Sequence, residues 1–510
     1  MKVHSHAQTP GDVVLEADVA IVGSGAGGAV VAAELAEAGQ QVVVLEEGKH
    51  IEPERYGRMR PSEQMRHMWR DAAMTFCTGL GDTPIINVAM GKCVGGSSVL
   101  TGGVCFRAPG EVLKTWREER GLSELTEAAL DPCYAAVEKA IHVEEVPESM
   151  RSRSTLLFAE GARKLGFELK PVRRNTDGCR GFARCNFGCP HRAKLSVDVS
   201  YLPRALAHGA QIHSDCLVER VRIEGDRATG VEGRVLNGRD GRPGGRLSVR
   251  ARRVVLAAGA YHSPLVLQAS KVGRASGQTG RNLTLHPAYR MMARFDEPVH
   301  GWRGALQSAY SDAFEKEGFT LMGIFTPPGV LAATMPGIGP THVARAKDIP
   351  HLAAFGGLLH DEASGRVSRA LFGREPFVSY RMSQADRAAA RRLIRRLAET
   401  FLAAGAREVF LPVLGLGPLD ADRLRAFDFD HLSLRHTECS SQHPLGTCRM
   451  GSSPAHSVVG PDGQTWDVRE LYVADGSVLP SSLGVNPQLT IMALATRIAW
   501  KMRELPPPPV

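Results

Sequence analysis

Long apolar runs are absent from the 510-residue sequence. Two of its long uncharged stretches, residues 19–33 and 476–496, are interrupted by Gly, Ser, Asn or Pro, whereas a membrane-spanning helix needs about 20 predominantly apolar residues. The N-terminal residues contain neither an apolar signal-peptide core nor a twin-arginine motif. We therefore expect no transmembrane segment and a cytoplasmic location. Export together with a partner protein stays an open alternative.

Cysteine, glycine and proline are also too scarce for the unusual chain classes. Ten Cys in 510 residues fall far short of the more than about 8–10% of a disulfide scaffold. The 54 Gly and 31 Pro stay below the roughly 25–30% of low-complexity chains.

At about 150 residues per domain the length predicts about three domains. The net charge of +8 comes from basic residues spread among 54 acidic ones, which predicts a solvated surface and no nucleic-acid partner.

A Gly-rich turn near the N-terminus lies between a strand and a helix. Residues 17–45 have the pattern of a β-branched strand, this turn, a helix and a second strand. In such a βαβ unit Gly23 permits the tight turn, Gly25 lets backbone N–H groups approach a pyrophosphate, and Gly28 lets helix and strand pack closely. Glu46, after the second strand, would accept hydrogen bonds from ribose hydroxyls. The pattern predicts a dinucleotide site, and the alternative is a Gly-rich turn that binds nothing.

Two later segments extend this prediction from a dinucleotide to a flavin, which needs contacts from distant parts of the chain. Residues 95–98 form a second Gly-rich segment that could approach a flat ring or its ribityl chain. Asp475 and Gly476 follow a short strand, where they offer a carboxylate to ribityl hydroxyls and a helix N-terminus to phosphate.

The segment between residues 290 and 434 has a different character. Residues 352–369 resemble a hairpin with a turn at 361–365. Ser383 and Asp386 form a capping box for a long helix, whose apolar stripe at i, i+4 spacing predicts core packing.

Six motifs in the same order resemble the glucose–methanol–choline (GMC) flavin oxidoreductases over nearly the whole chain. Two departures are Lys271, where the family usually has Gly, and Thr101, where Asn often contacts the flavin. The motifs are the N-terminal βαβ unit, GKCVGGSSVLTGG at 91–103, GAYHSPLVLQASKVG at 259–273, GRNLTLHP at 280–287, HPLGTCRMG at 443–451, and ADGSVLP with VNPQLTIMALA between 474 and 495.

The resemblance implies an α/β fold whose Rossmann-like FAD-binding domain is built from residues 1–110, 195–289 and 435–510. An α+β substrate domain with an antiparallel sheet is expected from residues 111–194, with the Cys-rich loop 178–190, and from 290–434. No His stands beside Gly96 as in members with a covalent flavin link, so non-covalent FAD is expected. The implied cofactor contacts are Gly23, Gly25, Gly28, Glu46, Gly95, Gly96, Ser97, Ser98, Thr101, Val218, Asp475, Gly476, Asn486 and Pro487.

Hydride transfer from an alcohol carbon to flavin N5 requires a base for the hydroxyl proton and a donor to the oxygen. By the resemblance, His443 occupies the base position and Asn486 the partner position, as in cholesterol and choline oxidases. An imidazole titrates near pH ~6.5, so His443 would be largely neutral at neutral pH. The Asn486 amide would hold the alcohol oxygen. Taken alone, any of the 18 His residues is more often structural.

Three cysteines, Cys179, Cys185 and Cys189, lie within eleven residues. Their frame resembles a bacterial ferredoxin run and the cluster-bearing subunit of bacterial FAD-dependent glucose dehydrogenases. One interpretation is a [3Fe–4S] cluster that relays electrons and favours a dehydrogenase. The other is a Gly-rich loop with buried or paired thiols, as in long-chain alcohol oxidases.

The resemblance predicts that the substrate is a small-molecule alcohol and that the electron acceptor is oxygen or another compound. Residues 352–380 resemble long-chain alcohol oxidases and dehydrogenases more than sugar oxidases, which favours lipophilic alcohols. A first alternative is a flavin-containing lyase or decarboxylase of the same fold. A second is a binding or electron-transfer protein in which FAD is mainly structural.

Overall fold

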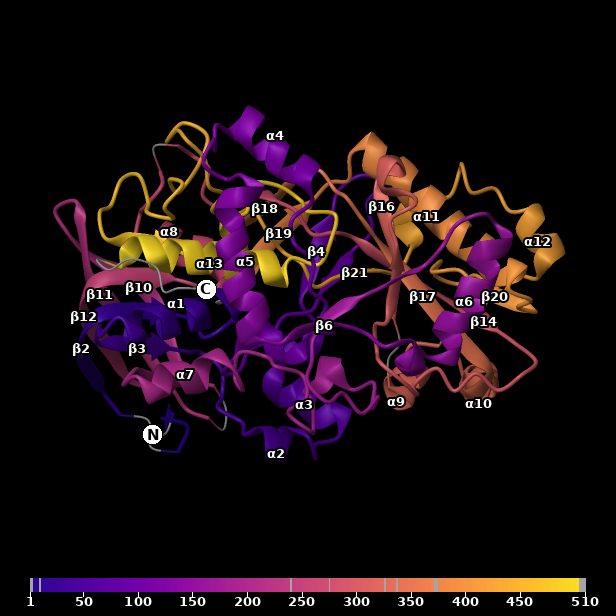
Figure 1. Ribbon diagram of the computed structural model, residues 1–510, viewed down its shortest axis with the longest axis horizontal. Helices are drawn as coiled ribbons and strands as arrows, with labels where there is room; N and C mark the ends of the chain where they lie inside the picture. The colour runs from indigo at the N-terminus through magenta and orange to yellow at the C-terminus, as the bar shows by residue number, and fades with distance from the viewer. Residues whose placement is uncertain are drawn as a thin grey trace.

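The protein is described by a computed structural model that covers residues 3–8, 11–238, 241–274, 276–324, 327–335, 338–370 and 375–503. Two large sheets with helices packed against them organise the chain, and they lie toward opposite ends of its long axis in Figure 1. The predicted mixed α/β class is confirmed. Among the described helices, none combines the length and the apolar character that crossing a membrane requires.

The first sheet has eight strands in the order β1-β9-β3-β2-β12-β11-β10, with β22 also paired to β12. Strands β1, β9, β3, β2, β12 and β22 pair in parallel, whereas β10, β11 and β12 form an antiparallel meander. The βαβ unit expected from the sequence is therefore present. The strands are β1 (His4–Ser5), β2 (Val13–Val22), β3 (Val42–Leu45), β9 (Gln211–Ser214), β10 (Cys216–Glu224), β11 (Arg227–Leu236), β12 (Pro243–Leu256) and β22 (Leu471–Val473).

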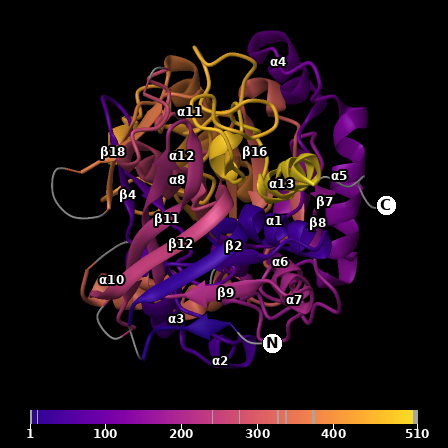
Figure 2. The ribbon, with the colours of Figure 1, turned by 90° about the vertical axis from the view of Figure 1, so that its left-hand side faces the viewer.

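Helices α1 (Ala26–Glu37), α5 (Glu127–Ala140) and α13 (Gln488–Met502) pack together on one side of this sheet (Figure 2). Helix α7 (Tyr201–Ala207) also contacts α1. The apolar residues of α1 and α13 are almost all buried. This layer brings the C-terminal helix against the first helix of the chain.

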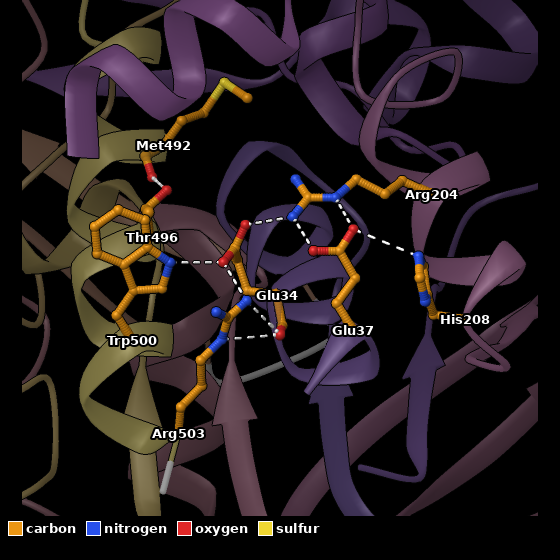
Figure 3. Close-up of polar contacts among 8 residues, drawn as sticks. All are labelled: Glu34, Glu37, Arg204, His208, Met492, Thr496, Trp500 and Arg503. Atoms are coloured by element: carbon orange, nitrogen blue, oxygen red, sulfur yellow. Dashed lines mark hydrogen bonds and ion pairs between the residues drawn. The ribbon is translucent and has the colours of Figure 1, made fainter. Parts of the chain in front are cut away.

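Buried Glu34 of α1 joins three of these helical segments (Figure 3). Its carboxylate accepts hydrogen bonds from Arg204 at 2.7 Å, from the Trp500 indole at 2.6 Å and from Arg503 at 2.6 Å. Arg204 also pairs with Glu37 on the next turn of α1. Every oxygen of the Glu34 carboxylate therefore has a partner, as a buried charge requires.

The second sheet has twelve strands in the order β13-β18-β19-β4-β5-β21-β14-β17-β16-β15-β7, with β20 also paired to β14. Most of its pairs are antiparallel, but β19 pairs with β4, and β21 with β5, in parallel. The strands are β4 (Phe76–Gly79), β5 (Ile86–Val88), β7 (Lys170–Pro171), β13 (Arg281–Leu283), β14 (Ala288–Arg294), β15 (Ala309–Ser311), β16 (Phe319–Gly323), β17 (Leu352–Leu359), β18 (Gly365–Arg369), β19 (Pro376–Tyr380), β20 (Glu408–Phe410) and β21 (Cys439–Ser441).

Helices α6 (Arg153–Lys164) and α11 (Gln384–Ala403) pack against each other and against this sheet. The predicted capping box is present, since Ser383 N donates to Asp386 at 2.9 Å and Asp386 N donates to Ser383 Oγ at 3.0 Å. The i, i+4 stripe of α11 is fully buried in the core, as expected. The other elements are α2 (Pro53–Tyr56), α3 (Pro61–Met68), α4 (Gly110–Arg120), α8 (Gly259–Ala269), α9 (Pro328–Ala333), α10 (Pro340–Lys347), α12 (Ala421–Arg425), β6 (Val143–Glu145) and β8 (Arg173–Asn175).

The expected hairpin at residues 352–369 is wrong. Strand β17 pairs with β14 and β16, whereas β18 pairs with β13 and β19. The physical reason lies at Asp361, whose buried carboxylate accepts hydrogen bonds from the backbone N–H groups of Leu285 and His286 and from the hydroxyl of Tyr380. These long-range bonds direct the chain after β17 away from a tight turn.

Candidate active site

A single cavity of about 1490 Å³ extends between the two sheets. It is lined by the Gly-rich turn after β2, by the meander strands, by β14 and by the segments around His443 and Asn486. Most of the predicted cofactor residues line it, namely Gly23, Gly25, Glu46, Gly96, Ser97, Ser98, Thr101, Val218, Asp475, Gly476, Asn486 and Pro487. Gly28 and Gly95 do not line it. The cavity therefore gathers residues that are hundreds of positions apart in the sequence.

Close backbone contacts bring the three predicted Gly-rich segments together. A Cβ atom on Gly96 would lie 2.9 Å from the Cα of Gly25, and one on Gly27 would lie 1.8 Å from the carbonyl oxygen of Ala474. A Cβ on Gly28 would lie 2.1 Å from the Gly23 oxygen, which agrees with its predicted packing role. Only glycine permits these approaches, so the segments fold as one unit around the cavity.

The N-terminus of α1 fits the phosphate part of a dinucleotide. Its N-cap residue, Gly25, provides no side-chain hydrogen bond to the helix, and a Cβ on Gly25 would meet nothing within 4 Å. The first N–H groups of a helix lack intrahelical partners and attract anions. An open helix end at the cavity wall is what a pyrophosphate needs.

Glu46 and Asp475 hold the loops of this unit as well as lining the cavity. Glu46 accepts hydrogen bonds from Ser24 N at 3.0 Å and Gly48 N at 2.8 Å. Asp475 accepts from Gly259 N and Ser477 N, both at 2.8 Å. Burial raises the pKa of both carboxyl groups, and these hydrogen bonds oppose the shift. Each also accepts from a serine hydroxyl, Glu46 from Ser24 at 2.7 Å and Asp475 from Ser263 at 2.5 Å. A carboxylate has about four acceptor positions, so each has about one left for a further hydroxyl group.

Lys194 is a supporting residue that the sequence analysis missed. Its ammonium group is buried and donates to the carbonyl oxygens of Val99 at 2.7 Å, Thr101 at 2.8 Å and Cys185 at 2.9 Å. Burial lowers the pKa of Lys194 to about 8. These bonds fix the backbone that carries Ser98 and Thr101 at the cavity. No sequence motif marks this lysine, because two of these acceptors, Val99 and Thr101, lie more than 90 residues upstream.

The Cys-rich loop does not form a metal site among the described residues. No group of three or more His, Cys, Asp or Glu side chains in that part of the chain is placed to hold a metal ion. Cys185 is buried and accepts a hydrogen bond from Arg174 at 3.0 Å, while Cys179 and Cys189 are partly exposed. The prediction of a [3Fe–4S] cluster finds no support in this geometry, and separate thiols in a Gly-rich loop agree with it.

The two predicted catalytic residues lie side by side. Nδ2 of Asn486 is 3.2 Å from Nε2 of His443, and both residues line the cavity. They are 43 residues apart in the chain, so only the folded protein brings them together. Burial lowers the pKa of His443 to about 4, which keeps the imidazole neutral near pH 7.

His286 is a second residue that the sequence analysis left without a role, although its motif, GRNLTLHP, was part of the family resemblance. Its Nδ1 lies 3.3 Å from Nδ1 of His443. Its Nε2 accepts hydrogen bonds from the backbone N–H groups of Leu483 at 3.0 Å and Gly484 at 3.2 Å. Asp361 holds the backbone of the same residue. His286 therefore positions the imidazole of His443.

These contacts determine the resting tautomers. Because two N–H groups donate to Nε2 of His286, its neutral ring carries the proton on Nδ1 and donates it to Nδ1 of His443. The neutral His443 then carries its own proton on Nε2. In the amide orientation that the structure shows, Oδ1 of Asn486 is buried without a partner. A 180° rotation of the amide lets this oxygen accept a hydrogen bond from Nε2–H of His443. In the resting site Nε2 of His443 is thus a donor.

Comparison with known proteins agrees with the motifs and the fold. Profiles of the GMC oxidoreductase family match residues 18–288 and 373–495. An uncharacterized GMC-type oxidoreductase of Mycobacterium tuberculosis is 37% identical over 493 residues, which cover 95% of this chain and 76% of that protein. A long-chain-alcohol oxidase of Arabidopsis thaliana, FAO3, is 27% identical over 96% of this chain and 68% of its own length.

Among solved structures, pyridoxine 4-oxidase from Mesorbium loti has a similar fold, with a TM-score of 0.70 and 20% sequence identity. The similarity covers 95% of this chain and 98% of that one. The predicted family, enzyme class and fold are confirmed: the chain belongs to the GMC oxidoreductase family of FAD flavoproteins.

Proposed function

We propose that this enzyme oxidises an alcohol to an aldehyde or ketone with non-covalently bound FAD. One observation carries the proposal: the same cavity is lined by the uncapped N-terminus of α1 and by the paired His443 and Asn486. The helix end and Glu46 would hold the ADP part of FAD, and Ser97, Ser98 and Thr101 would contact its ring system. Bound FAD supplies the acceptor for the hydride, at N5.

The division of the chain follows from the same arrangement. Residues 1–110, 195–289 and 435–510 contribute the first sheet and the Gly-rich segments, and they form the FAD-binding part. Residues 111–194 and 290–434 contribute most of the second sheet and cover the substrate end of the cavity.

The chain's own residues handle the hydroxyl group. Nε2 of His443 takes the hydroxyl proton, and the Asn486 amide holds the oxygen beside it. For this step Nε2 must be unprotonated, whereas the contacts of His286 favour the opposite tautomer at rest. Substrate binding therefore has to displace Asn486 from Nε2 and shift the His443 proton to Nδ1. Each ring stays neutral with one proton, and the proton of His286 moves from Nδ1 to Nε2. Nε2 of His286 then no longer accepts the hydrogen bonds from Leu483 N and Gly484 N, and this loss is the cost of the exchange.

Two kinds of support point to a lipophilic substrate. Long-chain-alcohol oxidases are among the relatives, and apolar side chains such as Leu306, Met322 and Leu358 line the same cavity as His443. The flavin-containing lyase or decarboxylase remains the alternative, because the same fold can hold FAD without net alcohol oxidation.

Anaerobic mixing of the holoenzyme with a panel of primary and secondary alcohols tests the proposal. Bleaching of the flavin absorbance supports alcohol oxidation, and re-oxidation by oxygen compared with a dye identifies the acceptor. Product formation with an unchanged flavin would instead favour the lyase. An unchanged flavin without any product would favour an electron-transfer or binding protein.

A further inference from the structure

Arg290 is a cation on the wall of the substrate end of the cavity. It lies on β14 opposite Gly356 of β17, and both residues line the cavity. His286 and Ala288, four and two residues earlier, line the same cavity. Since an extended chain spans at most about 3.6 Å per residue, the Cα atoms of His286 and Arg290 are at most about 14 Å apart. Arg290 is thus within one small molecule's length of the catalytic pair.

The guanidinium group of Arg290 is poorly compensated. It donates one hydrogen bond, to Thr334 Oγ1 at 3.2 Å. Within the described ranges, no carboxylate lies within the 4.0 Å that defines an ion pair with it. Burial lowers the pKa of Arg290, and the more distant Glu438, which also lines the cavity, opposes this shift. Its side chain is partly exposed to the cavity. Because an arginine stays charged in proteins, this charge faces the cavity without a carboxylate partner at close range among the described residues.

The surroundings of Arg290 are otherwise largely apolar. Met292, on the same face of β14, packs in a buried cluster with Leu306 and Met335. Leu306, Met322 and Ile324 also line the cavity. A Cβ on Gly356 would lie 3.0 Å from Ile324 Cδ1, so glycine keeps this space open. The cavity wall therefore combines the His443 and Asn486 pair, apolar side chains and the guanidinium group of Arg290.

We propose, building on the alcohol oxidation proposed above, that the substrate carries a carboxylate that binds Arg290 and Thr334 while its hydroxyl group lies at His443 and Asn486. The substrate class is a hydroxy acid with an apolar spacer between its two polar ends. Arginine binds a carboxylate through two parallel hydrogen bonds. A single negative charge is favoured over a dianion such as a phosphate monoester, because Glu438 shares the cavity wall. The carboxylate is unchanged by the reaction.

The test compares ω-hydroxyalkanoic acids with 1-alkanols of the same chain length. For the wild-type holoenzyme we expect a higher kcat/KM for the acids. In Arg290→Met, kcat/KM for the acids should fall by about 10- to 100-fold, the effect of losing a hydrogen bond to a charged group, while kcat/KM for the alkanols stays level or rises. Arg294→Met is the matched control, because Arg294 lies on the same strand but pairs with Glu408 at 2.7 Å.

Binding measured without turnover separates this proposal from the proposed function. Saturated alkanoates lack the hydroxyl group, so calorimetry with the holoenzyme reports the Arg290 site alone. Binding that is lost in Arg290→Met but kept in Arg294→Met supports the site even if no alcohol is oxidised. Equal changes of kcat/KM for acids and alkanols in Arg290→Met would overturn the proposal. Alkanoate binding of the same affinity in Arg290→Met and in the wild type would overturn it as well. Tighter Arg290-dependent binding of alkyl phosphates than of alkanoates would overturn the carboxylate assignment.

Discussion

Glu34 and Arg290 are both charged groups in the interior of the molecule, and their surroundings differ. Two arginines and an indole surround the buried Glu34 carboxylate within 2.7 Å (Figure 3). Arg290 is partly exposed, donates one hydrogen bond, to a threonine, and lines a cavity. A buried charge whose partners come from the chain joins helices together. A charge that faces a cavity without a carboxylate partner is instead available to a ligand.

The same contrast holds for the neutral polar groups of the two regions. Around Glu34 the donors and acceptors of α1, α7 and α13 are paired. In the cavity, only one of the two polar atoms of the Asn486 amide has a partner among the described residues, Nε2 of His443. We therefore expect substitutions in the helical layer to change stability and substitutions in the cavity to change catalysis.

The largest expected effect is that of His443→Ala on turnover. Removing the group that takes the hydroxyl proton should lower kcat by at least about 10²-fold, the usual contribution of a general base. The urea midpoint should change little, since His443 makes few structural hydrogen bonds. Stopped-flow flavin reduction measures the rate and urea unfolding the stability. A variant that reduced flavin at the wild-type rate would show that His443 is not the base.

Glu34→Gln should have the opposite profile. It leaves Arg503 and Arg204 without their shared charge, and breaking a buried ion pair typically costs about 3–5 kcal/mol of unfolding free energy. The rate of flavin reduction by the folded variant should match the wild type. The control is Glu37→Gln, whose partly exposed ion pair with Arg204 is worth about 1 kcal/mol or less. Equal losses in the two variants would contradict the role assigned to burial.

The cavity and the helical layer should lose their contributions to stability in different pH ranges as the pH falls. Burial lowers the pKa of His443 and of His360 to about 4, whereas an unfolded histidine titrates near 6.5. The unfolded chain therefore binds more protons between these values, and stability should fall as the pH drops from about 6.5 to 4. The hydrogen bonds of Arg204 lower the pKa of Glu37, so its contribution is present above about 4.5 and is lost at lower pH.

Urea midpoints measured from pH 8 to 3 test this order. The first loss should be smaller in His443→Asn, and the later one smaller in Glu37→Gln. Activity that depends on neutral His443 should stay level above about pH 5. An activity profile that rises with a midpoint near 6.5 would show that His443 is not buried as the structure has it.

The fold was largely predictable because its signals are local. The strand before Gly23, the positive φ of 100° at that glycine and the buried stripe of α11 follow from neighbouring residues. The hairpin prediction failed because Asp361 binds a backbone 75 residues away. No short-range pattern contains that information.

The residues of the candidate site also divide into those that the sequence predicts and those that only the fold reveals. His443 and Asn486 could be named from their motifs, although their 3.2 Å contact required the fold. Lys194, His286 and Arg290 could not be predicted, because their importance lies in acceptors, tautomers and missing partners that appear only when distant segments meet. The cysteine spacing was misleading for the converse reason: closeness in sequence did not place the three thiols as metal ligands.

The smallest expected effect concerns the proton shared by His286 and His443. In the resting holoenzyme, ¹⁵N NMR of histidine should show His443 protonated at Nε2, with its signal identified by loss in His443→Asn. In His286→Met, the side chain has no N–H or O–H group that could donate to Nδ1 of His443. The proton can then move to Nδ1, so the Nε2 signal should shift toward the unprotonated value. Turnover of the folded variant should stay level or rise, because the acceptor form is more populated. An unprotonated Nε2 in the resting wild type, or a tenfold loss of turnover in folded His286→Met, would mean that His286 helps His443 accept the proton rather than holding it in the donor form.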